Sequence, residues 1–264
     1  WKCPQGLGAA RLALACLLLA PAAVAAEFAG PGDQQYQSCV ALTKKAPEDA
    51  LESGMAWRDL GGGPPAKHCI ALALVAMKQY PEAAERLELL AEEMKTASPA
   101  FRAQIIDQAG NAWLLANQPD LAKKDFTEAL KLHPEDVDLL IDRSRASAAK
   151  KQFAEAVKDL DLALRLDPTR ADAHAFRGSA RRQLGDAAGA LEDVETALAI
   201  DPDQIDALLE RGLLRRAAGD KKGARQDWLK VALTAPNTPA ATAARQSVES
   251  GKSVDLGGRR IIKK

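Results

Sequence analysis

The chain has 264 residues, its 36 basic residues equal its 36 acidic ones, and aromatic side chains make up only 4% of it. A neutral chain with few aromatic residues lacks the basic and base-stacking surface that nucleic acids require, so a nucleic-acid partner is not expected.

Residues 1–26 have the pattern of a secretory signal peptide. Arg11 precedes an apolar run over 12–20, and small residues lead up to Ala26, after which we expect cleavage. The run is shorter than the about 20 residues of a membrane span. The sequence therefore predicts export, with the periplasm of a Gram-negative bacterium as the expected location and no integral membrane segment after cleavage. An uncleaved anchor and lipid attachment at Cys16 are the alternatives.

Residues 27–63 precede the repeated part of the chain and are expected to cap it. They contain two short helical segments, 33–45 and 47–60, followed by a glycine-rich linker. Removal of the signal peptide leaves two cysteines, Cys39 and Cys69, and an even pair in an exported chain favours a disulfide between them. Two free buried thiols are the alternative.

The rest of the chain repeats itself every 34 residues. Prolines recur with this spacing at 134, 168, 202 and 236, and a small residue stands 24 positions before each of them, at Gly110, Ser144, Gly178 and Gly212. A period of this length predicts stacked helix–turn–helix units. The predicted units are 103–136, 137–170, 171–204 and 205–238, with a degenerate unit at 64–102, a closing helix at 239–250 and a flexible basic tail at 251–264.

This pattern resembles the tetratricopeptide repeat (TPR) family, and the first complete unit shows it in Gly110, Trp113, Ala122, Phe126 and Pro134. The resemblance implies an all-α fold, a right-handed α-solenoid of about five repeats with N-terminal cap helices and a C-terminal closing helix. It also implies a concave groove, lined by the first helix of each repeat, that receives a protein or peptide.

By this resemblance, the groove residues are Asp107, Gln108, Asn111, Asp138, Ile141, Asp142, Arg145, Asp172, Phe176, Ser179, Arg182, Leu209, Glu210 and Leu213. One branch of the family clamps a partner's terminal carboxylate with basic and amide side chains. Only Asn111 fits that clamp here, so it is not supported. The acidic and apolar residues of the predicted groove would suit a basic or amphipathic segment, although each apolar residue could equally pack against the neighbouring repeat.

Two charged positions also recur with the repeat. Arginines share one position on successive first helices, and aspartates share one on successive second helices: Arg143, Arg177 and Arg211, with Asp159, Asp193 and Asp227, and Asp125 one unit earlier. We interpret them as a ladder of structural ion pairs along the array. A row of arginines that binds an acidic ligand is the alternative.

Catalytic motifs, a metal site and a cofactor are not expected. The three histidines fall in different units without ligand spacing, and Gly251-Lys252-Ser253 lacks the upstream glycine of a phosphate-binding loop. The sequence therefore predicts a non-catalytic periplasmic scaffold or adaptor that binds a protein or peptide in its groove. The alternative is a structural, self-associating component or buttress of a cell-envelope complex.

Overall fold

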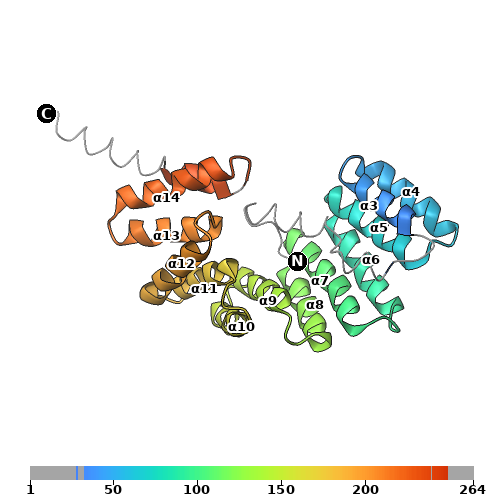
Figure 1. Cartoon of the computed structure of the whole chain (residues 1–264), viewed down its shortest axis with the longest axis horizontal. Coiled ribbons are helices and arrows are strands. Elements are labelled where there is room, and N and C mark those ends of the chain that lie inside the picture. The colour runs from blue at the N-terminus through green and yellow to red at the C-terminus, as the bar shows by residue number, and fades with distance from the viewer. Residues whose placement is uncertain (1–27, 29–32, 239, 249–264) are drawn as a thin grey trace. The chain divides into compact units, whose positions relative to one another are not determined.

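The computed structural model describes residues 28, 33–238 and 240–248, and the predicted signal peptide and basic tail lie outside them. Every element over these residues is an α-helix, which confirms the predicted all-α repeat fold (Figure 1). The helices are α3 (Asp33–Thr43), α4 (Pro47–Asp59), α5 (Gly63–Ala76), α6 (Tyr80–Glu93), α7 (Pro99–Leu115), α8 (Pro119–Leu132), α9 (Val137–Ala149), α10 (Phe153–Leu166), α11 (Ala171–Gln183), α12 (Ala187–Ile200), α13 (Ile205–Ala217) and α14 (Lys221–Thr234). A further helical stretch covers 240–248.

The described helices form two compact units. The N-terminal unit contains α3–α9, in which each helix packs on the next and α7 also contacts α9. The C-terminal unit contains α10–α14 and residues 240–248, and there α11 also packs against α13. Packing of each helix against its sequence neighbours is the arrangement that lets short helical units share a core.

The turn inside each repeat depends on one backbone conformation. Asn117, Lys151, Gly185 and Gly219 stand 34 residues apart, and their φ angles are 58°, 59°, 87° and 88°. This left-handed conformation ends a helix at low cost when the residue is glycine, because glycine has no Cβ. Two repeats therefore have glycine at this position. The other two have Asn117 and Lys151, whose side chains are less favourable in this conformation.

The small residue of each first helix lets the second helix approach closely. A Cβ added to Gly178 would lie 2.9 Å from Cγ1 of Val194 and 3.1 Å from the carbonyl oxygen of Ala190. Gly110 meets Phe126 and Gly212 meets Trp228 in the same way. Phe126, Val194 and Trp228 are themselves buried, so the recurring glycine makes room for a core side chain.

Candidate functional site

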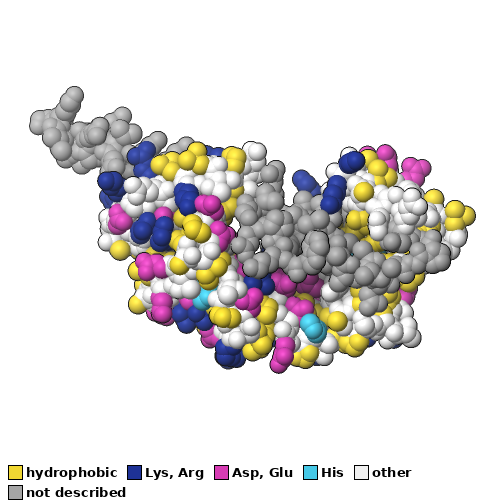
Figure 2. All heavy atoms as spheres, viewed as in Figure 1, with side chains coloured by type: hydrophobic (Ala, Val, Ile, Leu, Met, Phe, Trp, Pro, Cys, Tyr) yellow, Lys and Arg dark blue, Asp and Glu magenta, His cyan; other side chains and the backbone are white. Residues whose placement is uncertain are grey.

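Two predicted ion pairs of the C-terminal unit are in direct contact. Arg177 of α11 donates to both carboxylate oxygens of Asp193 on α12, with Nη2 2.6 Å from Oδ1 and Nε 3.0 Å from Oδ2. Arg211 and Asp227 repeat this contact one unit later, with Nη2 2.7 Å from Oδ1. Figure 2 shows the surface charges of the chain, on which Lys and Arg side chains are interspersed with Asp and Glu side chains.

Each of these aspartates binds a second arginine that the sequence analysis missed. Nη1 of Arg181 lies 2.9 Å from Asp193 Oδ2, and Nη1 of Arg215 lies 2.8 Å from Asp227 Oδ2. Burial opposes ionisation of Asp193, but the nearby His174 ring, the hydrogen bonds from Arg177 and the charges of Arg177 and Arg181 outweigh it and lower its pKa. The 34-residue spacing of Arg181 and Arg215 was the signal that could have revealed them.

The arginines of this ladder are engaged with protein carboxylates. Arg177 also reaches Asp161 of α10 at 2.8 Å, so one guanidinium joins two repeats. These ion pairs favour a structural role for the arginines over the alternative, a row of arginines that binds an acidic ligand. Arg143 belongs to the N-terminal compact unit and Asp159 to the C-terminal one, and their pairing stays a prediction.

Asp125 occupies the aspartate position of the ladder in a repeat that has no arginine to meet it. Ala109 and Trp113 stand where later repeats place their two arginines. Asp125 is 3% exposed and instead lies close to Glu88 of α6, whose Oε1 accepts the indole N–H of Trp113 at 3.1 Å. Burial first, and then the charge of Glu88, raise the pKa of Asp125 to about 8. Asp125 therefore keeps its proton at neutral pH.

The predicted groove residues of the N-terminal unit converge where α7 contacts α9. Nδ2 of Asn111 donates to Asp107 Oδ1 at 3.2 Å and to Asp142 Oδ2 at 2.8 Å. Nη1 of Arg145 lies 2.5 Å from Asp142 Oδ1. We call these four residues, Asp107, Asn111, Asp142 and Arg145, the acidic network.

In and around the acidic network, carboxyl groups outnumber the basic side chains that contact them. Burial raises the pKa of Asp107 well above its usual range, and the charges of Asp142, Asp136 and Asp138 raise it further. Hydrogen bonding to the carboxyl group of Asp142 acts on the pKa of Asp107 in the same direction. Burial and the neighbouring carboxylates therefore favour the protonated form of Asp107.

The remaining groove residues of the N-terminal unit differ in exposure. Ile141 is only 3% exposed, so it belongs to the interior and does not offer the apolar contact surface expected of it. Gln108 is 4% exposed, whereas Asp138 is exposed.

The groove residues of the C-terminal unit form separate contacts. Asp172 pairs with Arg170 at 2.7 Å, and Arg182 binds Glu210. Leu209 is half-buried against the core, whereas Leu213 is 38% exposed. Phe176 and Ser179 are half-buried.

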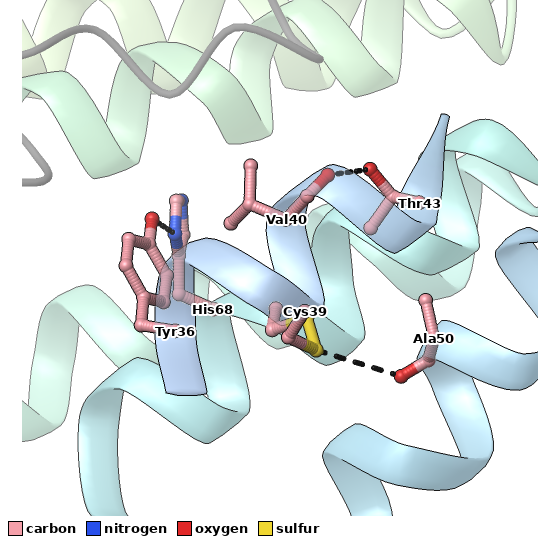
Figure 3. Close-up of a disulfide and its surroundings, with 7 residues drawn as sticks. Tyr36, Cys39, Val40, Thr43, Ala50 and His68 are labelled. Carbon is pink, nitrogen blue, oxygen red and sulfur yellow. Dashed lines mark hydrogen bonds between the residues drawn. A yellow bond between two sulfur atoms is a disulfide. The ribbon is translucent and has the colours of Figure 1, made fainter. Parts of the chain in front are cut away.

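A buried polar chain crosses the N-terminal unit beside a disulfide (Figure 3). The hydroxyl of Tyr36 on α3 lies 2.7 Å from Nδ1 of His68 on α5, and Nε2 of His68 lies 2.6 Å from Oε1 of Gln108 on α7. Burial lowers the pKa of His68 to about 4, so the ring is neutral. No motif in the sequence indicated this buried role for His68.

The disulfide joins the two predicted cysteines. Cys39 of α3 and Cys69 of α5 are bonded, with their Cα atoms 6.2 Å apart. The bond and the polar chain therefore fix α3 to α5.

Over the described ranges, 28, 33–238 and 240–248, no cluster of three or more His, Cys, Asp or Glu residues is arranged to hold a metal ion. The helices of this same part of the chain include none with the length and apolar character needed to cross a bilayer.

Comparison with known proteins agrees with this repeat architecture. Structures of MamA share the fold: MamA 41-end from Desulfovibrio magneticus RS-1 is 20% identical, covering 65% of this chain and 94% of its own, with a TM-score of 0.55. A second MamA structure is 18% identical and covers 62% of this chain and 94% of its own, with a TM-score of 0.52.

YrrB, described as a TPR protein with an unusual peptide-binding site, is 20% identical, with 73% and 96% covered and a TM-score of 0.49. No curated protein matches the sequence. The tetratricopeptide repeat model matches residues 108–171 and 177–242. The chain therefore belongs to the tetratricopeptide repeat family.

Proposed function

We propose that this protein is a non-catalytic scaffold that binds a basic segment of a partner protein at the face formed by α7 and α9. The family's repeats generally act as scaffolds for other proteins, which supports the class of function. The observation that carries the chemistry is the acidic network, in which Asn111 bridges Asp107 and Asp142 at the contact of two first helices and burial favours a proton on Asp107.

A lysine or arginine side chain can replace that proton. Its positive charge would allow Asp107 to ionise, and charge-assisted hydrogen bonds to carboxylates are stronger than neutral ones. Arg145 already holds one oxygen of Asp142, so the incoming cation would be shared mainly with Asp107. The face therefore favours a basic segment over an acidic one.

The proposed setting is the cell envelope of a Gram-negative bacterium, with the protein exported to the periplasm. The signal-peptide pattern of residues 1–26 supports this location. The Cys39–Cys69 disulfide adds support, because such bonds persist mainly in oxidising compartments. Fractionation of the native cells, followed by thiol labelling of the periplasmic extract, tests both points.

The binding proposal is tested with short labelled peptides that differ only in charge. Fluorescence anisotropy should show that lysine- and arginine-containing peptides bind, whereas matched glutamate-containing peptides do not. Replacement of both carboxylates, D107N with D142N, should weaken binding about tenfold or more, since it removes the charge that the cation needs. The exposed Glu85 of α6 provides a control, because E85Q changes charge outside the network. Equal binding of basic and acidic peptides would contradict the proposal.

A second candidate is a structural role through self-association. On α14, Leu229 is 42% exposed and Leu233 is 80% exposed, and exposed apolar side chains of one helix are typical of a contact surface. Sedimentation of the full chain would show a concentration-dependent dimer under this candidate, and L229K with L233K would abolish it. A monomer at all concentrations would leave the scaffold as the better function.

A further inference from the structure

Helix α4 has a second apolar face that the core of the N-terminal unit does not bury. The helix packs against α3 and α5, and its inner face buries Ala50, Gly54 and Trp57. Leu51 and Met55 lie on a different side of the helix, where Leu51 is half-buried and Met55 is 40% exposed. Because these two residues are four positions apart, their side chains are neighbours on the helix surface. This second face is apolar surface beyond what the core uses.

The end of α5 completes a hollow beside this face. The hollow has a volume of about 400 Å³, and we call it the α4 hollow. It is lined by Glu48, Leu51, Glu52, Met55, Ala56 and Met77. Met77, at the C-terminal end of α5, is half-buried. Methionine side chains are flexible and polarizable, so they adapt to apolar side chains of different shapes. The α4 hollow therefore suits apolar side chains of a partner.

The charged residues that line the α4 hollow are both acidic. Glu48 and Glu52 are exposed and stand one helical turn apart on α4. The arginine of the same helix, Arg58, pairs with Asp59 at 2.8 Å, whereas among the described residues no side chain forms an ion pair with either glutamate. Charged groups at a contact surface select partners of the opposite charge. The α4 hollow therefore favours an occupant that combines apolar side chains with basic ones.

The backbone around the hollow decides the form of that occupant. Helices use their backbone N–H and C=O groups internally, so the occupant has to be held by its side chains. An amphipathic helix satisfies its own backbone and presents a stripe of apolar side chains beside charged ones. A small molecule is less suited, because its sites usually have several polar groups that converge on it, whereas the polar side chains here are two glutamates.

We propose that the α4 hollow binds an amphipathic helix of a partner protein, with apolar side chains in the hollow and lysine or arginine side chains beside Glu48 and Glu52. The α4 hollow shares no residue with the acidic network. The inference therefore adds a second binding surface and does not rest on the proposed function.

The methionines of the chain provide the test. Met55 and Met77 line the α4 hollow, whereas Met94 packs against the core of the same unit. The full chain, labelled at its methionine methyl groups, is titrated with a designed helical peptide that carries leucines at i, i+4 and i+7 with lysines beside them. The NMR signals of Met55 and Met77, assigned with M55L and M77L, should shift, and that of Met94 should not.

Variants of the peptide and of the protein separate the apolar contribution from the charge. Peptides with serine in place of leucine, or glutamate in place of lysine, should bind at least about tenfold more weakly. M55K should weaken binding about tenfold, whereas L89K, the same kind of change at a 59% exposed leucine of α6, should not. E48Q with E52Q should weaken binding of the lysine peptide and reduce its dependence on salt, and E85Q should do neither.

Three outcomes would overturn the inference. The first is that no peptide shifts the signals of Met55 and Met77, or that M55K and L89K have equal effects. The second is a shift of these signals that grows with protein concentration alone, which would assign the hollow to a second copy of the chain. The third is loss of the shifts in D107N with D142N, which would place the peptide on the acidic network and leave the proposed function standing.

Discussion

The same substitution, Asp to Asn, should have opposite effects at two equivalent positions of the repeat. Asp125 and Asp193 occupy one position in different units, and their side chains are almost fully buried at 3% and 2% exposure. Asp193 lies between two arginines, whereas Asp125 lies beside Glu88. The expected change in the free energy of unfolding therefore depends on the neighbours and not on the position.

At Asp193 the substitution removes the charge that holds two guanidinium groups. Arg177 and Arg181 would keep their positive charges at 17% and 25% side-chain exposure without the carboxylate that offsets them. Loss of one partner from a buried pair typically costs 3–5 kcal/mol, and the partial exposure of the arginines reduces this to about 2–3 kcal/mol. D227N should behave alike, because Asp227 has the same two-arginine environment.

At Asp125 the substitution replaces a protonated carboxyl group by a neutral amide of similar shape. The raised pKa means that the folded chain keeps a proton that the unfolded chain releases above about pH 4. The contribution of Asp125 to the free energy of unfolding is then greatest in acid. It declines by about 1.4 kcal/mol per pH unit until the folded pKa of about 8 is reached. D125N removes this decline. The free energy of unfolding of D125N, relative to that of the unaltered chain, should therefore rise by about 3–4 kcal/mol between about pH 5 and pH 8.

Urea denaturation at several pH values measures both effects. Trp113, whose indole donates to Glu88, reports on the N-terminal unit, and Trp228 reports on the C-terminal unit. Circular dichroism follows both units together. The groups that act on Asp125 are Glu88 of α6 and Lys124 and Glu128 of its own helix, so E88Q serves as the matched test of the partner.

Two outcomes would refute this reasoning. One is a D125N chain that is less stable than the unaltered chain by more than about 1 kcal/mol at pH 8, because the raised pKa of Asp125 predicts the reverse. The other is an unchanged slope of stability against pH, which would mean that Asp125 is ionised in the folded chain.

Three further changes test the packing of the repeat. G178A should cost about 1–3 kcal/mol because its Cβ would meet Val194 and a backbone carbonyl, and V194A should partly restore stability in thermal melts. K151G should raise stability by about 0.5–1 kcal/mol, since the φ of 59° favours glycine; a lower melting temperature would contradict this. Reduction of the Cys39–Cys69 bond should cost roughly 3–4 kcal/mol for a sequence separation of 30 residues, whereas a chain with both cysteines changed to alanine should show no response to reductant.

The sequence predicted the helices and turns of the repeats well, because the residues that each repeat needs recur at the same positions. A proline, a small residue and a left-handed turn recur every 34 residues, and each recurrence strengthens the assignment of the helices. The arginine–aspartate contacts of the C-terminal unit could be predicted for the same reason. Ile141 shows the limit of this approach, because a repeat position on a first helix does not reveal whether its side chain faces the surface or the interior.

By itself, the sequence determined the all-α repeat, the helix boundaries to within a few residues, and the candidate pairs of charged residues. Only the tertiary structure decided the raised pKa values of Asp107 and Asp125 and the path from Tyr36 through His68 to Gln108. The pKa of a carboxyl group depends on burial and on charges that approach from other helices. Residues 31 to 40 positions apart along the chain make these contacts, and a repeating pattern in the sequence does not contain their distances.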